Sequence, residues 1–178
     1  MNVELMLLTV LQGLRTRILD AVMLFFTHLG DAGLIWAALT VVLLVFRRTR
    51  RVGCVLAAAL LVDAVLCNLI LKPLVARVRP CDILADVQLL ISRPDDFSFP
   101  SGHTAASFAS VTALWLAGKK RWALAALPLG VLIAFSRMYL CVHYPTDILG
   151  GVILGAACGW AGAWLVKKAE RRMAIPRN

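Results

Sequence analysis

Charged side chains are scarce in this chain. Only 16% of its 178 residues are Asp, Glu, Lys or Arg, whereas 61% are apolar, and the mean hydropathy is +0.82. A composition this poor in charge excludes an ordinary water-soluble core and indicates a polytopic membrane protein. Because a spanning helix needs about 20 residues, the chain has room for about five or six spans and little else. We therefore predict one membrane-embedded domain over residues 1–178.

The first residues lack the features of a cleaved signal peptide. They have no basic start and no small-residue cleavage site, and Glu4 stands where such a peptide is positively charged. We expect these residues to be retained. Residues 3–14 are expected to form a short interfacial helix or, alternatively, part of the first span.

Metal-binding and nucleic-acid-binding patterns are also missing. No cluster of carboxylates, or of Cys and His, has the spacing of metal ligands, and Asp82, Asp86, Asp95 and Asp96 are scattered over a loop that we expect to be solvated. No basic patch is interleaved with stacking aromatic residues, which argues against a nucleic-acid partner. We predict no cofactor, no metal site and no nucleic-acid partner.

Apolar runs divide most of the chain into candidate spans, near 16–30, 31–46, 52–71, 102–118, 122–141 and 147–166. They predict an all-α bundle of six transmembrane helices. The first two runs are short, since a helix of about 15 residues covers only about 22 Å, so we expect them to extend at their ends or to lie where the bilayer is thin. The long connection over residues 72–101 is of a length that is usually functional in compact proteins.

Basic residues are unevenly distributed between the predicted loops. Under six spans, 14 of the 19 Lys and Arg residues fall on one side, in segments 15–17, 47–51, 119–121 and 167–177. By the positive-inside rule this side faces the cytoplasm, which places residues 72–101 and 142–146 on the extracytoplasmic side of the cell membrane. Anionic lipid headgroups then account for most of the net charge of +9.

Three of the remaining cations stand at predicted helix ends beside apolar sequence. These are Lys72, Arg79 and Arg137, and an unpaired charge is costly at such positions. One such residue alone is most simply explained by a side chain that reaches up to the lipid headgroups. Three of them together with two histidines predict an anion site. Arginine offers a planar fork of donors and lysine adds a point charge, so the set suits a dianionic phosphoryl group.

The tetrapeptide Pro100 to His103 opens the fourth predicted span. Ser101 is suited to cap the helix, and its backbone and that of Gly102 can surround phosphate oxygens at the helix N-terminus. Taken alone, the tetrapeptide is also compatible with an ordinary capped helix start. Because His103 is its last residue and is expected to face the outer side, His103 becomes a candidate acid for a leaving oxygen.

His143 and Asp147 are four residues apart where the last span begins, with Pro145 suited to its first turn. A carboxylate that accepts the proton of one ring nitrogen leaves the other nitrogen free to attack phosphorus. We therefore predict that Asp147 orients the ring and that His143 is the nucleophile. A lone interfacial histidine would more often be structural, but Arg137, six residues before His143, is expected to return to the same place.

These three segments resemble the pattern of a known family, the type-2 phosphatidic acid phosphatase superfamily of lipid phosphate phosphatases and vanadium haloperoxidase-like proteins. The matching residues are Lys72, Arg79 and Pro80; Pro100 to His103; and Ser136, Arg137, His143 and Asp147. The resemblance implies a phosphohistidine intermediate on His143, with His103 first protonating the departing group and then activating water. It also implies that no metal is required.

The motifs recognise a phosphate and do not identify the lipid. Small bacterial members of the family that the chain resembles include undecaprenyl diphosphate phosphatases and phosphatidylglycerophosphate phosphatases. Since an extracytoplasmic site suits the cell-wall carrier, we favour undecaprenyl diphosphate, with phosphatidylglycerophosphate or phosphatidate as the alternative. A non-catalytic scaffold and a transporter are alternatives of another class, although a transporter would place charges inside the spans, where only Asp63 is deep. The expected partners are the lipid substrate and membrane lipids, and the oligomeric state is not predicted.

Two features remain open on the sequence alone. Cys81 and Cys141 both fall at the predicted outer face, where a disulfide would be compatible with an oxidising compartment. Asp63 lies near the middle of the third apolar run, with Asn68 about one and a half turns further on. An ionisable group at that depth indicates function by default, but an internal helix–helix hydrogen bond explains it equally well.

Overall fold

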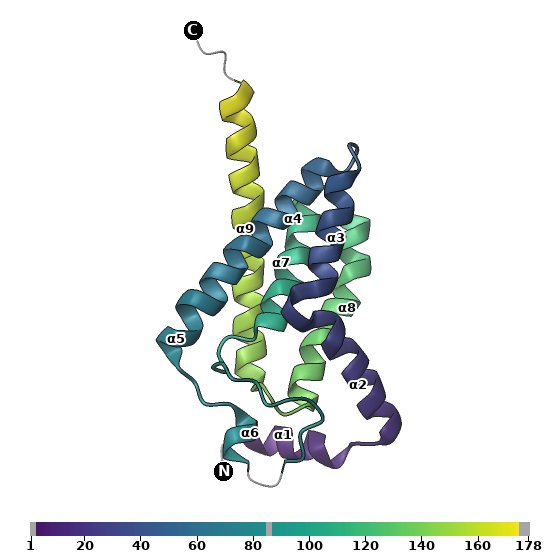
Figure 1. The fold of residues 1–178 in the computed structure, drawn as a ribbon, viewed down its shortest axis with the longest axis vertical. Coiled ribbons are helices and arrows are strands. Elements are labelled where there is room, and N and C mark those ends of the chain that lie inside the picture. The colour runs from purple at the N-terminus through teal and green to yellow at the C-terminus, as the bar shows by residue number, and fades with distance from the viewer. Residues whose placement is uncertain (1–2, 85–86, 175–178) are drawn as a thin grey trace.

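The computed structural model describes residues 3–84 and 87–174, and every regular element within them is a helix (Figure 1). The predicted all-α fold is confirmed. Helix α1 (Val3–Gly13) lies across one end of the bundle, close to α6 and to the turn at 140–144, and we call this the site end. The distal end is formed by the turns at 46–49 and 117–119. Asp86 and Arg177, which entered the predictions above, lie outside the described residues.

The two short runs predicted as separate spans form one kinked segment. Helices α2 (Arg17–Gly30) and α3 (Leu34–Val45) run in the same direction, joined by the 3-10 turn η1 (Asp31–Gly33) (Figure 1). Ala32 and Gly33 have positive φ angles of 50° and 69°, so the helix axis bends there without reversing. By length and composition, Arg17–Val45 is one candidate span of 29 residues. The predicted count of six spans is therefore not met here, because neither half reaches the length of about 20 residues that a span needs.

The kink changes where the first basic residues lie. Arg15 precedes α2 and Arg17 is its first residue, so both lie at the site end and not on the side of the other basic segments as predicted. Arg15 Nη1 donates a hydrogen bond to the backbone oxygen of Gln88 at 2.8 Å, and its Nε lies 3.2 Å from Asp20 Oδ1. Most of the Lys and Arg residues still belong to the distal end and to the part of α9 beyond it.

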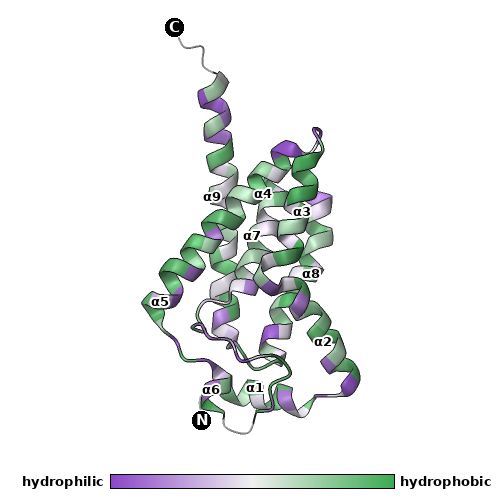
Figure 2. Cartoon of the chain, viewed as in Figure 1, coloured by the Kyte–Doolittle hydropathy of each residue, from purple (hydrophilic) through white to green (hydrophobic). Residues whose placement is uncertain are grey.

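The third segment returns from the distal end toward the site. Helix α4 (Arg50–Asp63) continues as the π-helix η2 (Ala64–Leu71) and then as α5 (Lys72–Val75), and α6 (Pro80–Ile83) follows at the site end. The stretch Arg50–Ile83 is a candidate span by length and composition. A π-helix is wider than an α-helix and is frequent at functional sites. Figure 2 shows that hydrophobic residues predominate along this segment.

Helices α7 (Gly102–Leu116), α8 (Lys120–Tyr139) and α9 (Pro145–Ala174) complete the bundle. Helix α7 is apolar but only 15 residues long, whereas Lys120–Tyr139 and Pro145–Met173 are candidate spans. Glycine allows α7 and α9 to pack closely, since a Cβ on Gly155 would lie 2.3 Å from the backbone oxygen of Ala105. This contact brings the first turns of both helices together, where Ser101 N donates to Asp147 O at 3.1 Å.

Candidate active site

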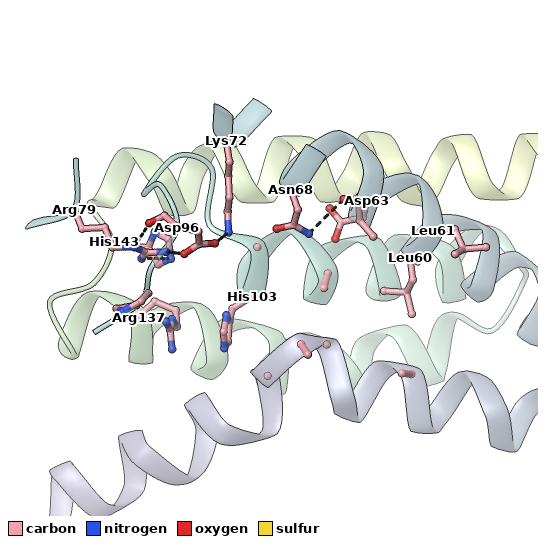
Figure 3. A pocket seen from close by; sticks show the side chains of 18 residues that line it. Leu60, Leu61, Asp63, Asn68, Lys72, Arg79, Asp96, His103, Arg137 and His143 are labelled. Atoms are coloured by element: carbon pink, nitrogen blue, oxygen red, sulfur yellow. Dashed lines mark hydrogen bonds and ion pairs between the residues drawn. The ribbon is translucent and has the colours of Figure 1, made fainter. Parts of the chain in front are cut away.

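A pocket of about 530 Å³ lies between the α2–α3 kink and the wall formed by α4, η2 and α7 (Figure 3). Each of the three motifs contributes side chains to its lining. The motif residues that line it are Lys72 and Arg79, Gly102 and His103, and Arg137 and His143. The predicted residues Ser101 and Asp147 lie directly behind this lining, and both are fully buried. The structure therefore brings together residues that are up to 75 positions apart in the sequence.

His143 lies in the turn between α8 and α9 and is 2% exposed. Its Nδ1 lies 3.4 Å from Asp147 Oδ2, and its Nε2 lies 3.2 Å from Arg79 Nη1 on the pocket side. The distance to Asp147 exceeds the usual N–H···O range of about 2.7–3.2 Å, and such contacts in substrate-free sites often shorten when the ligand binds. Burial, opposed by Asp147 and assisted by the charges of Arg79 and Arg137, lowers the pKa of His143 to about 3. The ring is therefore neutral at neutral pH.

Asp147 is held by several donors. Its Oδ2 accepts hydrogen bonds from Ser98 Oγ and from Tyr144 N, the latter at 2.9 Å. Its Oδ1 lies 2.7 Å from Arg77 Nη1. Because donors surround both oxygens, the carboxylate is fixed against the ring of His143.

The three predicted cations, Lys72, Arg79 and Arg137, form a buried cation cluster with exposed fractions of 7%, 3% and 4%. Arg137 donates from Nη1 to Thr27 Oγ1 of α2, while its Nε has no hydrogen-bond partner among the described residues. The cluster therefore keeps an unused donor next to the pocket. Burying three charges together is costly unless an anion compensates them.

The anion present in the cation cluster is a side chain of the protein. The carboxylate of Asp96 binds both Lys72 Nζ and Arg79 Nη2, and the backbone oxygen of Asp96 accepts from Arg79 Nε at 2.8 Å. Burial alone would raise the pKa of Asp96, but the bonds to Lys72 and the charge of Arg79 lower it to about 2. The side chain of Asp96 is half-exposed, as expected for a solvated loop, but the contacts with Lys72 and Arg79 were not predicted.

The N-terminus of α7 faces the cation cluster. Ser101 Oγ accepts from Thr104 N at 3.5 Å, which is the predicted N-cap contact. A Cβ placed on Gly102 would lie 3.8 Å from Lys72 Nζ, so the backbone at this position borders the cluster. The first turn of the helix, with its free N–H groups, therefore opens toward the same point as the cations.

His103 is aligned by a carboxylate from a different element. Its Nε2 lies 3.0 Å from Oδ1 of Asp31, the first residue of η1 in the α2–α3 kink. A carboxylate that holds one ring nitrogen leaves the other to face a ligand, as predicted for Asp147 and His143. The sequence analysis missed Asp31. Its signal was an acidic residue flanked by Gly30 and Gly33 between two apolar runs that are each too short to span.

Arg77 is a second residue that the sequence analysis missed. Its guanidinium lies 2.7 Å from Asp147 Oδ1 and 2.7 Å from Glu4 Oε2, and it stacks 3.9 Å from the ring centre of Tyr144. Glu4 also accepts hydrogen bonds from Thr146. Helix α1 is thereby connected to the predicted His–Asp pair. Arg77 lies inside the first motif, at a position that the motif leaves unspecified.

Several open points of the sequence analysis have a structural outcome. Cys81 and Cys141 are both buried free thiols, so no disulfide joins them. Asp63 is 4% exposed and lines the pocket, and its Oδ1 has no hydrogen-bond partner among the described residues. The internal helix–helix hydrogen bond considered for Asp63 is therefore not formed by Oδ1. Within residues 3–84 and 87–174, no group of three or more His, Cys, Asp or Glu side chains could hold a metal ion.

The fold and the site together define a membrane-embedded helical protein in which two histidines and three buried cations line one pocket. The profile of the PAP2 superfamily matches residues 51–171, and the chain belongs to this superfamily. The family that the three motifs indicated is thus confirmed.

Similar proteins of known name and structure agree with this placement. The chain is 35% identical over 156 residues to an undecaprenyl-diphosphatase of Sulfolobus acidocaldarius, covering 87% of this chain and 73% of that protein. It is 34% identical over 150 residues to phosphatidylglycerophosphatase B of Bacillus subtilis, covering 77% and 70%. The crystal structure of Aquifex aeolicus LpxE superimposes with a TM-score of 0.76 at 30% identity, covering 91% of this chain and 95% of that one.

The crystal structure of the PAP2-type phosphatidylglycerolphosphate phosphatase from Bacillus subtilis superimposes with a TM-score of 0.72 at 29% identity, covering 98% of this chain and 87% of that one. Both crystal structures therefore align along nearly the whole of this chain.

Proposed function

We propose that this protein is a membrane lipid phosphatase that hydrolyses a lipid phosphate or diphosphate through a phosphohistidine on His143. One observation supports this most directly. The Nε2 of a buried, neutral His143 lies 3.2 Å from Arg79 beside the cation cluster, with Asp147 behind the ring. Membership in the PAP2 superfamily supports the same reaction class.

In the first step, His143 Nε2 forms a bond to phosphorus and the bond from phosphorus to the leaving oxygen breaks. The leaving oxygen takes a proton from His103, which Asp31 holds by its other nitrogen. Asp147 stabilises the positive charge that the ring of His143 acquires. The cation cluster and the N-terminus of α7 bind the phosphoryl oxygens, and the loss of one such donor should cost on the order of 10²–10³ in rate.

In the second step, His103 takes a proton from a water molecule as its oxygen attacks phosphorus. The bond between phosphorus and Nε2 breaks, inorganic phosphate leaves, and His143 returns to its neutral form. Both histidines therefore end the cycle in the protonation state in which they began it. The side chains of the chain itself suffice for every proton transfer in this scheme.

For the substrate, we propose undecaprenyl diphosphate, with phosphatidylglycerophosphate as the second candidate. Relatives named for the first lipid support it, among them the Sulfolobus protein and BcrC of Bacillus subtilis at 29% identity over 145 residues. The second candidate is supported by the Bacillus phosphatidylglycerophosphatases described above.

We also propose that the site end faces the extracytoplasmic side of the cell membrane. Most Lys and Arg residues belong to the distal end and the adjoining part of α9, and the positive-inside rule assigns that end to the cytoplasm. Because Arg15 and Arg17 lie at the site end, the two ends differ less in their number of Lys and Arg residues than predicted, but the distal end still has more.

Phosphate release by the purified protein in detergent tests the proposed reaction. Undecaprenyl diphosphate and phosphatidylglycerophosphate are supplied in parallel, with EDTA present, to the wild type and to His143→Ala. We expect release that persists in EDTA and disappears in the variant, because no other described group replaces Nε2. The ratio of the two rates identifies the preferred lipid. Release from neither lipid, or release that the variant retains while its elution volume and melting temperature are unchanged, would refute the proposal.

A further inference from the structure

The pocket continues beyond the cation cluster along a second polar surface. Figure 3 shows the order of the side chains, from His143 and Arg79 past His103 to Asn68 and Asp63, and then to Leu60 and Leu61. The proposed reaction uses only the first part of this series. Asp63 and Asn68 line the pocket without any role in phosphate binding.

The π-helix explains why these polar residues share one face. Asp63 is the last residue of α4, Asn68 lies within η2, and Lys72 follows as the first residue of α5. In a π-helix the hydrogen bonds join residues five apart, so each turn contains more residues than an α-turn. Positions 63, 68 and 72 therefore lie above one another along the pocket wall.

The direction of the reaction places the leaving group against this wall. In phosphoryl transfer the attacking and leaving atoms lie roughly in line on opposite sides of phosphorus. His143 lies at one end of the series of lining side chains, so a leaving oxygen opposite it points toward His103 and the remainder of the alcohol toward Asn68 and Asp63. Beyond them the lining becomes apolar, with Leu60, Ala37 and Ala106, as an acyl or prenyl chain requires.

Asp63 is costly where it lies. It is 4% exposed between apolar helices, and Asn68 Nδ2 donates to the backbone oxygen of Ala64 at 3.3 Å and not to the Asp63 carboxylate. The Asp63 Oδ1 atom has no hydrogen-bond partner among the described residues. A buried carboxylate without a donor is strongly unfavourable. A donor supplied by a ligand would compensate for it.

We propose that Asp63, with Asn68 beside it, forms a subsite that accepts a hydrogen bond from a hydroxyl or amide N–H on the alcohol side of the scissile phosphate. The inference rests on the proposed function and extends it. Lipid phosphates whose leaving alcohol bears such a donor form a second substrate class, in addition to a prenyl diphosphate, which has none. Asp63 selects the alcohol, whereas the cation cluster selects the phosphate.

A matched pair of lipids tests the subsite. One is phosphatidylglycerophosphate, and the other is the analogue in which hydrogen replaces the free glycerol hydroxyl. Leaving a buried acceptor without a donor typically costs about 1–3 kcal/mol, so the wild type should favour the hydroxylated lipid in kcat/KM by about 10- to 100-fold. Asp63→Ala should reduce this ratio to about one, and Asp63→Asn, which retains one acceptor oxygen, should give an intermediate ratio.

Asp95→Ala is the control and should keep the wild-type ratio, because Asp95 is an exposed aspartate of the loop between α6 and α7 that does not line the pocket. A wild-type ratio near one would overturn the subsite without need of any variant. An Asp63→Ala ratio equal to that of the wild type would do the same. If the wild type releases phosphate from neither lipid nor from undecaprenyl diphosphate, the proposed function itself fails. If all three are hydrolysed without regard to the hydroxyl, only the subsite fails.

Discussion

The protonation state of His143 follows from its surroundings. The ring is buried between two arginines, and only Asp147 favours its charged form. A nucleophile needs a free electron pair on Nε2, so a ring that stays neutral is ready to react throughout the physiological pH range. Many catalytic bases have a pKa near neutral pH, whereas burial keeps this ring unprotonated by lowering its pKa well below that range.

We therefore expect His143 not to titrate between pH 5 and pH 8. Nitrogen NMR of labelled imidazoles in detergent measures this, with His143→Gln to assign the signal. Because burial and the nearby arginines lower the pKa of the folded ring to about 3 from the unperturbed value of about 6.5, the unfolded chain binds an extra proton between these values. The free energy of unfolding is therefore unaffected by this group above about pH 6.5, and it decreases as the pH falls toward 3. A titration midpoint between pH 5 and pH 8 would contradict the expectation.

At the same scale, we expect Asp96 to compete with the substrate phosphate of the proposed reaction. Its carboxylate binds the two cations that the phosphoryl group needs, and its low pKa keeps it charged at any pH of interest. Asp96→Asn should lower the inhibition constant of orthovanadate, a phosphate analogue, by about 10-fold, since a bond to a charged group is removed from the competing state. Inhibition curves with Asp95→Asn as the neighbouring control measure this. Weaker or unchanged inhibition by orthovanadate would show that Asp96 supports the site instead of occupying it.

At the scale of elements, α1 belongs to the site although it contributes nothing to the pocket lining. Glu4 and Arg77 connect it to Asp147, and Gln12 Nε2 donates to the backbone oxygen of Tyr139 at 2.7 Å. Both contacts end on the segment that includes His143. The helix thus stabilises the turn between α8 and α9, where a small displacement of the ring would have a large effect on rate.

Arg77→Ala should accordingly reduce kcat on the order of 10²-fold with little change in KM, because Arg77 positions Asp147 and does not line the pocket. Arg77→Lys should restore part of the rate, since a lysine supplies one of the lost charges. Steady-state kinetics on the preferred lipid measures both. Arg93→Ala is the control, because it removes an exposed arginine of the same 72–101 connection. A change confined to KM, or an equal loss in the control, would contradict the positioning role.

Tertiary contacts decided which parts of the site could be predicted from the sequence. His143 and Asp147 are one helical turn apart, and His103 directly follows Pro100 to Gly102, so each of these two patterns is local. Asp31, by contrast, acts on His103 from a distance of 72 positions. Asp96 was visible only as one of several loop aspartates, because nothing local indicates that the loop folds back onto Lys72.

At the scale of the whole molecule, hydropathy revealed the apolar runs but not the direction of each run. The segment from Gly30 to Gly33 is compatible with a reversal as well as with a bend, and the two differ in where every preceding residue lies. Because the chain bends and does not reverse, Arg15 and Arg17 lie at the site end. The same bend places Asp31 next to His103. Helix direction depends on the backbone angles of Ala32 and Gly33, which composition does not specify.

The carboxylate of Asp96 should also affect which phosphates can bind to the cation cluster, since they must displace it. A tethered group competes at a high effective concentration, typically in the millimolar range for a short flexible tether. Dissolved phosphate at low concentration displaces such a group poorly. A phosphate anchored in the bilayer is confined to a thin layer next to the pocket and reaches comparable local concentrations. We therefore expect Asp96 to raise the concentration at which dissolved anions bind, and to hinder a phosphate anchored in the bilayer less.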